Sequence, residues 1–440
     1  MADLLPALQQ PDYPDQNLLD DIAADLSRRP PLVTSWEVDR LRGLLAKAAT
    51  GKQFLLQGGD CAERFDECRA DVILGRLKIL LQMSLVLIHG LRLPVIRVGR
   101  FAGQYAKPRS EDTEIIDGVE LKSYRGDIIN GPEADVLARL PDPRRMLEAY
   151  GNSAMTLNFV RALVDGGFAD LHHPQNWDLG FVEPSGLKRE YQEIVDGITG
   201  ALRFMETVSN TTLGDVERVD FYTSHEALLL PYEQALTRQV PSGGTYNLST
   251  HFPWIGLRTS EPSGAHVTYA AGIRNPLGIK VGPDTEPSTL KRLLNSLDPD
   301  HEAGRLSLIT RFGVDRASDA LPRLIAAVQS TGRTVLWSCD PMHGNTEVTQ
   351  DGLKTRRFEN VLGELEQVFA IHDRYDSILG GVHFELTGEN VTECIGGSGG
   401  LTESDLSRAY RSHVDPRLNA EQALEMAFSI VKNRKSEPST

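Results

Sequence analysis

The chain has 440 residues, four cysteines and a formal net charge of −15. That length fits two or three average domains, or one large α/β barrel with insertions. The negative charge argues against nucleic acid or an anionic membrane as the main partner, and four cysteines are too few for a disulfide-rich secreted scaffold. The first thirty residues show no signal-peptide pattern, so we expect a cytoplasmic protein.

The most apolar window, residues 72–93, is interrupted by Arg76, Lys78, Gln82 and His89. This pattern favours a buried amphipathic helix over a membrane span. We therefore expect no association with a membrane.

Residues 1–50 read as an N-terminal arm with helical patterns at 17–26 and 35–48, separated by Pro30 and Pro31. Ser35 suits the N-cap position of the second helix. We expect a catalytic region over residues 51–435, which contains an insertion at 111–218, and a flexible tail at 436–440.

Eight short, mostly apolar runs follow the arm, as expected for strands buried on both faces. They lie at residues 54–58, 94–99, 219–223, 245–250, 277–281, 306–310, 334–338 and 380–384. Helical patterns follow most of them, at residues 70–90, 226–238, 264–272, 288–297, 317–330, 358–373 and 420–432. This alternation predicts a (β/α)8 TIM barrel. An open doubly wound sheet is the alternative, but neither a GxGxxG nor a P-loop motif supports it.

About 120 residues separate the second and third runs, far more than a simple βαβ crossover needs. This segment contains a strand-like piece at 118–124 and helical patterns at 145–165 and 188–208. An insertion of this size can cover a barrel mouth, build an oligomer interface or bind a regulator.

In a TIM barrel the chemistry gathers where the strands end. Almost every predicted strand is followed by ionisable side chains: Asp60, Cys61, Arg100, His225, Glu226, His251, Lys280, Arg311, Cys339, Asp340, His343 and Glu385. Lys107, Arg109 and Arg258 follow closely. So many cations at one mouth of an acidic protein predict a substrate with several phosphate or carboxylate groups.

Cys61, His343, Glu385 and an aspartate would suit a divalent transition metal such as Mn²⁺, Fe²⁺, Co²⁺ or Zn²⁺. Cys61 could equally be a small buried apolar residue. His225, His251 and His383 could be core histidines or could support residues of the site.

Seven segments carry a family resemblance. They read LLQGGDCAERF (55–65), GQYAKPRS (103–110), SYRGD (123–127), SHEAL (224–228), WSCDPMHGNT (337–346), HFELTGENVTEC (383–394) and DPRLN (415–419). From about residue 10 to residue 432, the chain resembles the type II 3-deoxy-D-arabino-heptulosonate 7-phosphate (DAHP) synthases. Motifs of this length and number are highly specific.

The resemblance implies condensation of phosphoenolpyruvate with erythrose 4-phosphate, the first step of the shikimate pathway to aromatic amino acids. It places the metal, Mn²⁺ or Co²⁺, at Cys61, His343, Glu385 and Asp415. It places phosphoenolpyruvate at Arg100, Arg258, Lys280 and Arg311, and the erythrose phosphate at Lys107, Arg109 and Ser110. The candidate catalytic residues are Glu226, Lys280 and His343. The family also suggests a homo-oligomer, with chorismate mutase as a possible partner.

Leu257 departs from the family pattern, because the chain reads WIGLRT where the family usually reads WIGERT. If the glutamate acts through its side chain, substrate handling will differ here; if only its backbone amide acts, leucine is harmless. Leu257 therefore leaves open a synthase of secondary metabolism, such as an aminoDAHP synthase or a synthase of a phenazine pathway. A silent member that regulates a partner is a separate alternative, and the retained Cys61, His343, Glu385 and Asp415 count against it.

Overall fold

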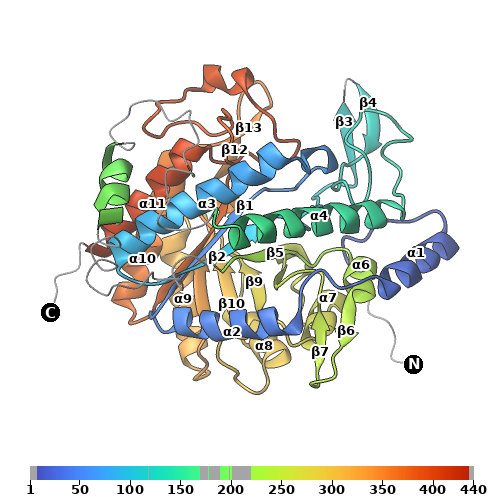
Figure 1. Cartoon of the computed structure of the whole chain (residues 1–440), viewed down its shortest axis with the longest axis horizontal. Coiled ribbons are helices and arrows are strands. Elements are labelled where there is room, and N and C mark those ends of the chain that lie inside the picture. The colour runs from blue at the N-terminus through green and yellow to red at the C-terminus, as the bar shows by residue number, and fades with distance from the viewer. Residues whose placement is uncertain are drawn as a thin grey trace.

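The structure, a computed structural model, describes residues 7–116, 118–168, 177, 189–197, 199–200 and 220–435. Eight parallel strands form a closed barrel in the order β1-β14-β11-β10-β9-β8-β5-β2, which confirms the predicted TIM barrel (Figure 1). The strands are β1 (Phe54–Gly59), β2 (Val95–Arg100), β5 (Tyr222–Glu226), β8 (Phe252–Ile255), β9 (Leu277–Val281), β10 (Leu306–Thr310), β11 (Leu336–Cys339) and β14 (Leu379–Glu385).

Helices surround the barrel and bury its outer face. They are α3 (Ala70–Leu91), α6 (Leu230–Ala235), α7 (Ala265–Ala271), α8 (Pro287–Leu297), α9 (Ala317–Gln329), α10 (Phe358–Arg374) and α11 (Ala420–Lys435). The helix α8, for example, does so with one apolar face. Four of its leucines recur at helical spacing and are all buried: Leu290, Leu293, Leu294 and Leu297. The strands are buried on both faces, as their apolar runs predict.

The helix α3 is the one described helix that is long and apolar enough to cross a membrane. However, 72% of its most apolar stretch is buried inside the protein, as in the core helix of a globular domain. It packs closely on α11, where a Cβ at Gly90 would overlap Val431. Close packing against a second helix explains the apolar composition.

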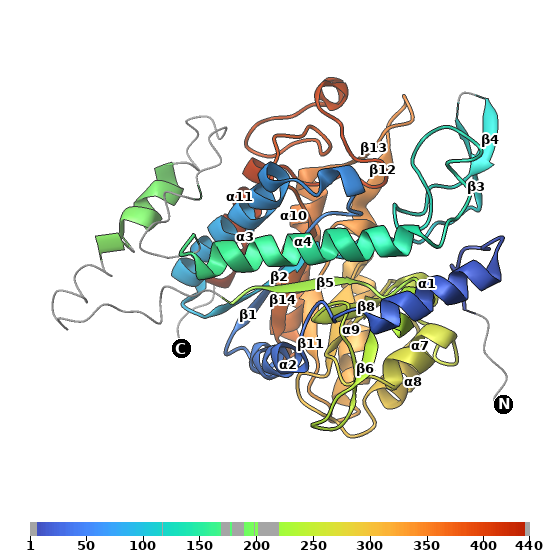
Figure 2. The same cartoon turned by 45° about the vertical axis from the view of Figure 1, so that its right-hand side comes forward.

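The predicted arm contains two helices, α1 (Gln16–Arg28) and α2 (Ser35–Ala49). The helix α2 lies across the end of the barrel where the strands begin, and its Leu41 and Leu45 join the interior cluster that includes Leu55 and Leu336 (Figure 2). The predicted N-cap at Ser35 is wrong by one residue. Thr34 caps α2 instead, because Glu37 pairs with it in a reciprocal capping box.

Two predicted strands are misplaced. The run 245–250 does not form the fourth barrel strand, since β7 (Thr245–Asn247) pairs with β6 (Thr237–Gln239) in an antiparallel hairpin. The fourth strand is β8. The sequence pattern did not predict it, because it contains Pro253, and proline lacks the N–H group that a central strand uses in its hydrogen bonds. The third strand, predicted at 219–223, is β5 and lies three residues later.

These shifts move two histidines away from the mouth. His251 comes before β8 rather than after a strand, and its Nδ1 accepts a hydrogen bond of 3.0 Å from the amide of Thr223. His225 lies within β5, where its Nε2 is 2.8 Å from Glu233 Oε1. Both are buried, and neither lines the pocket described below.

The segment between β2 and β5 contains the hairpin β3 (Thr113–Ile116) and β4 (Val119–Lys122), followed by α4 (Arg145–Asp165), which packs against α3. Residues 189–197 and 199–200 are helical, and the rest of the helix predicted at 188–208 lies outside the described residues. A second hairpin, β12 (Thr346–Val348) and β13 (Lys354–Arg356), follows β11.

Candidate active site

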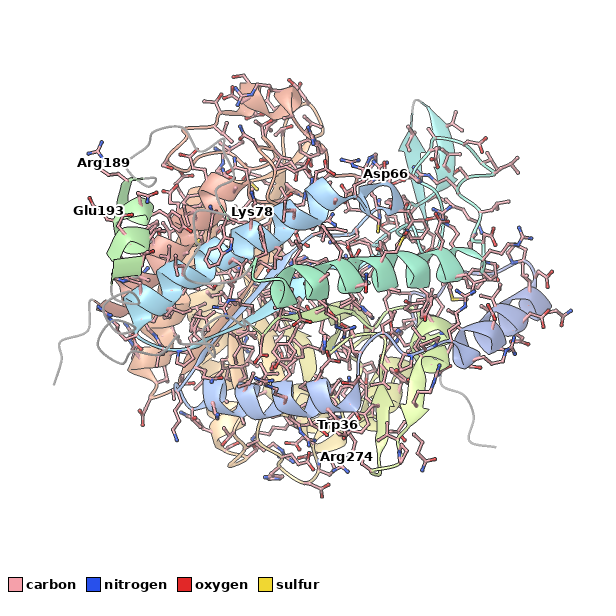
Figure 3. The ribbon with its side chains drawn as sticks, viewed as in Figure 1. Trp36, Asp66, Lys78, Arg189, Glu193 and Arg274 are labelled. Atoms are coloured by element: carbon pink, nitrogen blue, oxygen red, sulfur yellow. The ribbon has the colours of Figure 1, made fainter. Side chains whose placement is uncertain are left out.

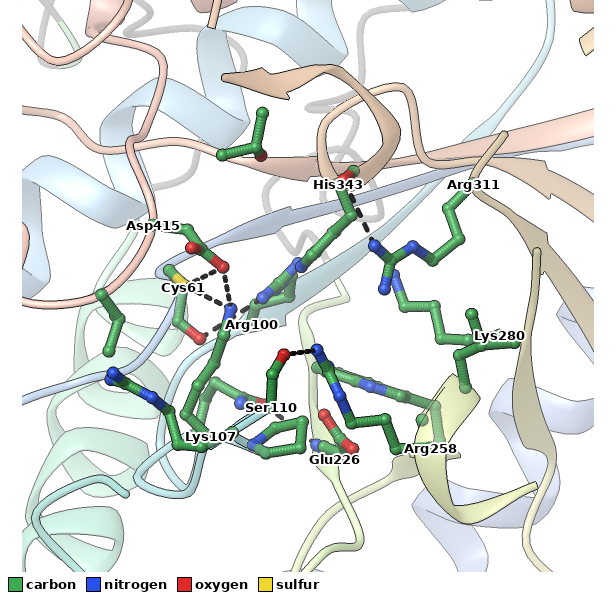
Figure 4. Close-up of a pocket in the computed structure, with 18 of the residues that line it drawn as sticks. Cys61, Arg100, Lys107, Ser110, Glu226, Arg258, Lys280, Arg311, His343 and Asp415 are labelled. Carbon is green, nitrogen blue, oxygen red and sulfur yellow. Dashed lines mark hydrogen bonds and ion pairs between the residues drawn. The ribbon is translucent and has the colours of Figure 1, made fainter. Parts of the chain in front are cut away.

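A pocket opens at the carboxyl ends of the barrel strands, as the strand-end pattern predicts (Figure 4). The structure brings almost all the predicted site residues to its wall: Cys61, Arg100, Lys107, Arg109, Ser110, Glu226, Arg258, Lys280, Arg311, His343 and Asp415. Glu385 lies just beneath this wall and is fully buried.

The predicted metal ligands converge although hundreds of residues separate them. Single ligand atoms of Cys61, Glu385 and Asp415 lie within 4.8 Å of one another. His343 Nε2 is 3.0 Å from Glu385 Oε1, so the imidazole borders the same group. A thiol, an imidazole and two carboxylates are a donor set that a divalent transition ion prefers.

The ammonium of Lys107 lies among these ligand atoms. Its Nζ is 2.7 Å from Cys61 Sγ, 2.7 Å from Asp415 Oδ2 and 3.5 Å from Glu385 Oε1. Burial alone would lower the pKa of Lys107, but Asp415, Cys61 and Glu385 outweigh it and raise that pKa above its usual value. The cluster is therefore built to hold a positive charge.

The protonation of the cluster bears on how it could bind a metal. Burial, reinforced by Glu385, raises the pKa of Cys61 to about 12, so the thiol keeps its proton beside Lys107. Burial would raise the pKa of Glu385, but His343 and Lys107 hold it well below its usual value. A metal ion would bind by taking the place of a thiol proton.

Arginines hold Glu385 from two sides. Arg100 Nη2 is 3.0 Å from Glu385 Oε1, and Arg356 Nη2 is 2.7 Å from Glu385 Oε2. All three side chains are almost completely buried. Because a lone buried carboxylate would be very costly, these cations keep Glu385 ionised and fixed in place.

The opposite wall of the pocket carries the cations predicted to bind an anion. Arg258 Nη2 donates a hydrogen bond of 2.6 Å to Ser110 Oγ, and Arg311 Nη2 donates one of 3.2 Å to the carbonyl of His343. Lys280 forms a close ion pair with Asp340, and burial lowers the pKa of Lys280 to about 8. This wall presents forked guanidinium donors of the kind that bind phosphate and carboxylate.

The chain also matches known proteins over nearly its whole length. Residues 3–431 match the class-II DAHP synthetase family. The chain belongs to this family. It is 48% identical to the phospho-2-dehydro-3-deoxyheptonate aldolase of Neurospora crassa (98% of this chain, 93% of that protein) and 47% identical to that of Streptomyces coelicolor (97% and 95%).

A third relative, the phospho-2-dehydro-3-deoxyheptonate aldolase AroG of Mycolicibacterium smegmatis, is 43% identical over 97% of this chain and 92% of its own length. Among solved structures, a phospho-2-dehydro-3-deoxyheptonate aldolase from Francisella tularensis matches with a TM-score of 0.53 at 14% identity, over 94% of this chain and 96% of its own. At that identity the likeness concerns the barrel fold alone.

Glu226 is a carboxylate of the pocket that stands apart from the cluster of Cys61, Glu385 and Asp415. It lines the pocket, and its Oε1 is buried and makes no hydrogen bond within the described part of the chain. Burial raises the pKa of Glu226. A Cβ at position 256 would overlap Glu226 Oε1, so Gly256 leaves the space that this carboxyl group fills.

Sequence analysis missed several residues at the site: Gln104, Trp254, Thr346, Lys354 and Val414 line the pocket, and Arg356 lies behind it. Trp254 could have been found only by placing β8 correctly. Thr346 ends the motif WSCDPMHGNT, but no role was assigned to it. Lys354 and Arg356 lie on the β12–β13 hairpin, where no barrel strand ends, so no local pattern marked them.

Leu257 lines the mouth of the pocket and is 38% exposed. A Cβ at Gly282 would lie 2.9 Å from Leu257 Cδ2, so the leucine lies directly over that glycine. The side chain therefore adds an apolar contact at the rim beside Arg258.

Proposed function

We propose that the chain condenses phosphoenolpyruvate with erythrose 4-phosphate and water to give DAHP and phosphate, the first step of the shikimate pathway. The observation that carries the proposal is one pocket that joins an anion-binding wall to a cluster of metal-ligand type. The shared name of three relatives at 43–48% identity supports it. Those names favour this reaction over the aminoDAHP alternative.

The cation wall suits phosphoenolpyruvate, whose phosphate and carboxylate carry several negative charges. Arg100, Lys280 and Arg311 would hold these groups, and Arg258 beside Ser110 lies at the rim. Lys107, Arg109 and Ser110 would hold the phosphate of the sugar. Two anions must be neutralised before they can be held in reacting distance, and this wall supplies the charge.

Cys61, His343, Glu385 and Asp415 would hold the metal, which we propose to be Mn²⁺ or Co²⁺. The donor set and its convergence support this assignment, as does the ammonium that the cluster already holds. A metal bound here would supply Lewis-acid polarisation of the aldehyde. Its binding would require Lys107 Nζ to leave the three ligand atoms, which its flexible side chain permits.

The remaining step is proton transfer to and from the water that adds to the substrate. Glu226, with its raised pKa and unpartnered Oε1, is the residue we propose for it. Lys280, with a pKa near 8, and His343 are the other two candidates. A steady-state assay of phosphate release from the two substrates tests the proposed reaction. Its absence in metal-loaded protein would favour a silent regulatory member of the family.

We expect Arg311→Ala to raise KM for phosphoenolpyruvate and to lower kcat/KM about ten- to a hundredfold. Hydrogen bonds to charged groups contribute roughly 1.5–3 kcal/mol each. Arg316→Ala is the matched control, because Arg316 pairs with Asp284 at 2.7 Å on the exposed surface. Such a pair contributes about 0–1 kcal/mol to stability and nothing to substrate binding. Equal kcat/KM values for the two variants would show that Arg311 does not bind phosphoenolpyruvate.

We expect Leu257→Glu to be neutral or harmful with erythrose 4-phosphate, because the surrounding cations and ligand-type residues are all retained. Leucine can neither accept a hydrogen bond nor hold a charge. Kinetics of the wild type, Leu257→Glu and the uncharged Leu257→Gln with the same two substrates test this expectation. A large gain in Leu257→Glu alone would show that a carboxylate is needed there, and would favour a different aldehyde or imine substrate.

We propose that the protein acts as a cytoplasmic homo-oligomer. Trp36 on α2 is 81% exposed (Figure 3), and Ile115 on the β3–β4 hairpin is 77% exposed, so both are candidates for a contact between subunits. Chorismate mutase remains a possible partner that the family resemblance suggests. Size-exclusion chromatography with light scattering measures the oligomeric state directly.

A further inference from the structure

A chain of four polar side chains crosses the interior of the barrel beneath the pocket. Gln57 Nε2 lies 3.0 Å from Ser224 Oγ, His383 Nδ1 lies 2.8 Å from Gln57 Oε1, and Arg100 Nη1 lies 2.6 Å from His383 Nε2. The four residues come from β5, β1, β14 and β2, and each is at most 1% exposed. Polar groups this deeply buried are costly unless every partner is satisfied.

The direction of every hydrogen bond in this chain is fixed from both ends. Ser224 must donate to the carbonyl of Gly99, 3.1 Å away, because a carbonyl only accepts. Its oxygen then accepts from the amide NH₂ of Gln57, which turns the amide oxygen toward His383. At the other end, Arg100 can only donate. Both ends therefore require the same imidazole, with its proton on Nδ1 and a lone pair on Nε2 facing Arg100.

The histidine fixes the guanidinium at the floor of the pocket. Arg100 Nη1 points to His383, Nη2 points to Glu385 at 3.0 Å, and Cζ lies over the Trp254 ring, 5.2 Å from its centroid. The Nε–H of Arg100 has no hydrogen-bond partner within the described residues. Arg100 lines the pocket, so the contacts that hold Nη1 and Nη2 also set how the guanidinium is presented to an anion there.

We propose that Gln57 and His383 are positioning residues that set the orientation of Arg100 toward the bound substrate anion. The proposal rests on the proposed function, in which Arg100 binds phosphoenolpyruvate. Gln57 holds the tautomer of His383, and His383 holds the plane of the guanidinium. An apolar side chain at position 383 would fill the same space but leave a buried Arg100 donor unpaired.

The test compares two buried histidines, of which only one contacts Arg100. His383 and His372 each pack edge-on against a tryptophan, with ring centroids 5.2 and 5.4 Å apart, but only His383 contacts Arg100. We expect His383→Leu to raise KM for phosphoenolpyruvate about tenfold, and to leave KM for erythrose 4-phosphate within about twofold. His372→Leu should change neither KM. Gln57→Met, which does not touch Arg100, should move KM for phosphoenolpyruvate in the same direction by less.

The decisive experiment introduces His383→Leu into the Arg100→Lys variant. If His383 acts through Arg100, adding His383→Leu to Arg100→Lys should not raise KM for phosphoenolpyruvate further. A full additional rise would overturn the proposal, as would an unchanged KM in both His383→Leu and Gln57→Met. If His383→Leu fails to fold, Gln57→Met alone decides.

The proposed function and this inference can fail separately. If the metal-loaded wild type releases no phosphate from the two substrates, the proposed reaction fails. Calorimetric titration of the same variants with phosphoenolpyruvate alone then still measures its dissociation constant. An unchanged constant in His383→Leu and Gln57→Met would overturn the positioning role, and a rise confined to these variants would support it.

Discussion

Cys61→Ser should weaken the binding of Mn²⁺ or Co²⁺ more than about 100-fold and reduce activity to match. Loss of a residue that merely supports a metal ligand typically costs 10–100-fold in affinity, and loss of the thiolate itself should cost more. A serine hydroxyl is neutral and hard, whereas a thiolate is charged and soft. Cys61 Sγ lies within 4.8 Å of the ligand atoms of Glu385 and Asp415, and among the described residues that line the pocket Cys61 alone carries sulfur.

Titration calorimetry with Co²⁺ on the wild type and Cys61→Ser measures the effect, and the cobalt–thiolate absorption band should appear only in the wild type. Cys68→Ser is the control, because Cys68 contacts the Asn152 carbonyl and lies outside the pocket. Exhaustive EDTA treatment should abolish activity, and Mn²⁺ or Co²⁺ should restore it. Full activity after such treatment, or an unchanged cobalt affinity in Cys61→Ser, would refute the metal site.

The position of ionisable residues at the strand ends predicted much of the site, because the ends of all the strands of a barrel meet at one place. Cys61, Arg100, Lys280 and Arg311 each follow or end a strand whose apolar run is easy to recognise. The parallel barrel then brings these residues together at its carboxyl end, whatever their distance in sequence. The apolar residues that form each strand are next in sequence to the ionisable residues at its end, so recognising the strand also locates the candidate site residue.

Residues outside that geometry gave no such signal. Asp415 lies in the long segment between β14 and α11, and only the resemblance to a family indicated it. Gln57 reads as an ordinary strand residue, and the sequence leaves open whether His383 is a core histidine or supports the site, because their role depends on which neighbours share the barrel interior. The strand β8 was not predicted because it contains Pro253, and a proline in a central strand contradicts the usual hydrogen-bonding pattern.

Arg76 shows how a buried charge can be overlooked in an apolar helix. In sequence it merely interrupts the apolar window of α3. In the structure its Nε forms a close ion pair with Asp60, Nη2 is 2.6 Å from Glu67 Oε2, and Nη1 is 3.5 Å from Glu63 Oε2. Arg417 provides a second partner for Asp60 at 2.6 Å. One guanidinium thus pairs with three carboxylates beneath the pocket, and Arg417 adds a second positive charge at Asp60.

Arg76→Met should lower the free energy of unfolding by about 3–5 kcal/mol, the usual cost of removing one partner from a buried ion pair. The change in urea midpoint at constant m-value measures it. Arg69→Met is the control, because Arg69 at the start of the same helix pairs with Asp71 on the exposed surface, where such a pair contributes about 0–1 kcal/mol. Similar midpoints for the two variants would contradict the prediction.

The same substitution should also disturb the site, because the network holds both sides of it. Asp60 immediately precedes Cys61, and Glu63 Oε1 accepts hydrogen bonds of 2.9 Å from the amides of Gly103 and Gln104, in the loop that leads to Lys107. Without Arg76, Glu63 would remain as a buried carboxylate, and burial already raises its pKa. Adding Glu63→Gln should therefore recover part of the lost stability, since it removes one of the charges that Arg76 neutralised.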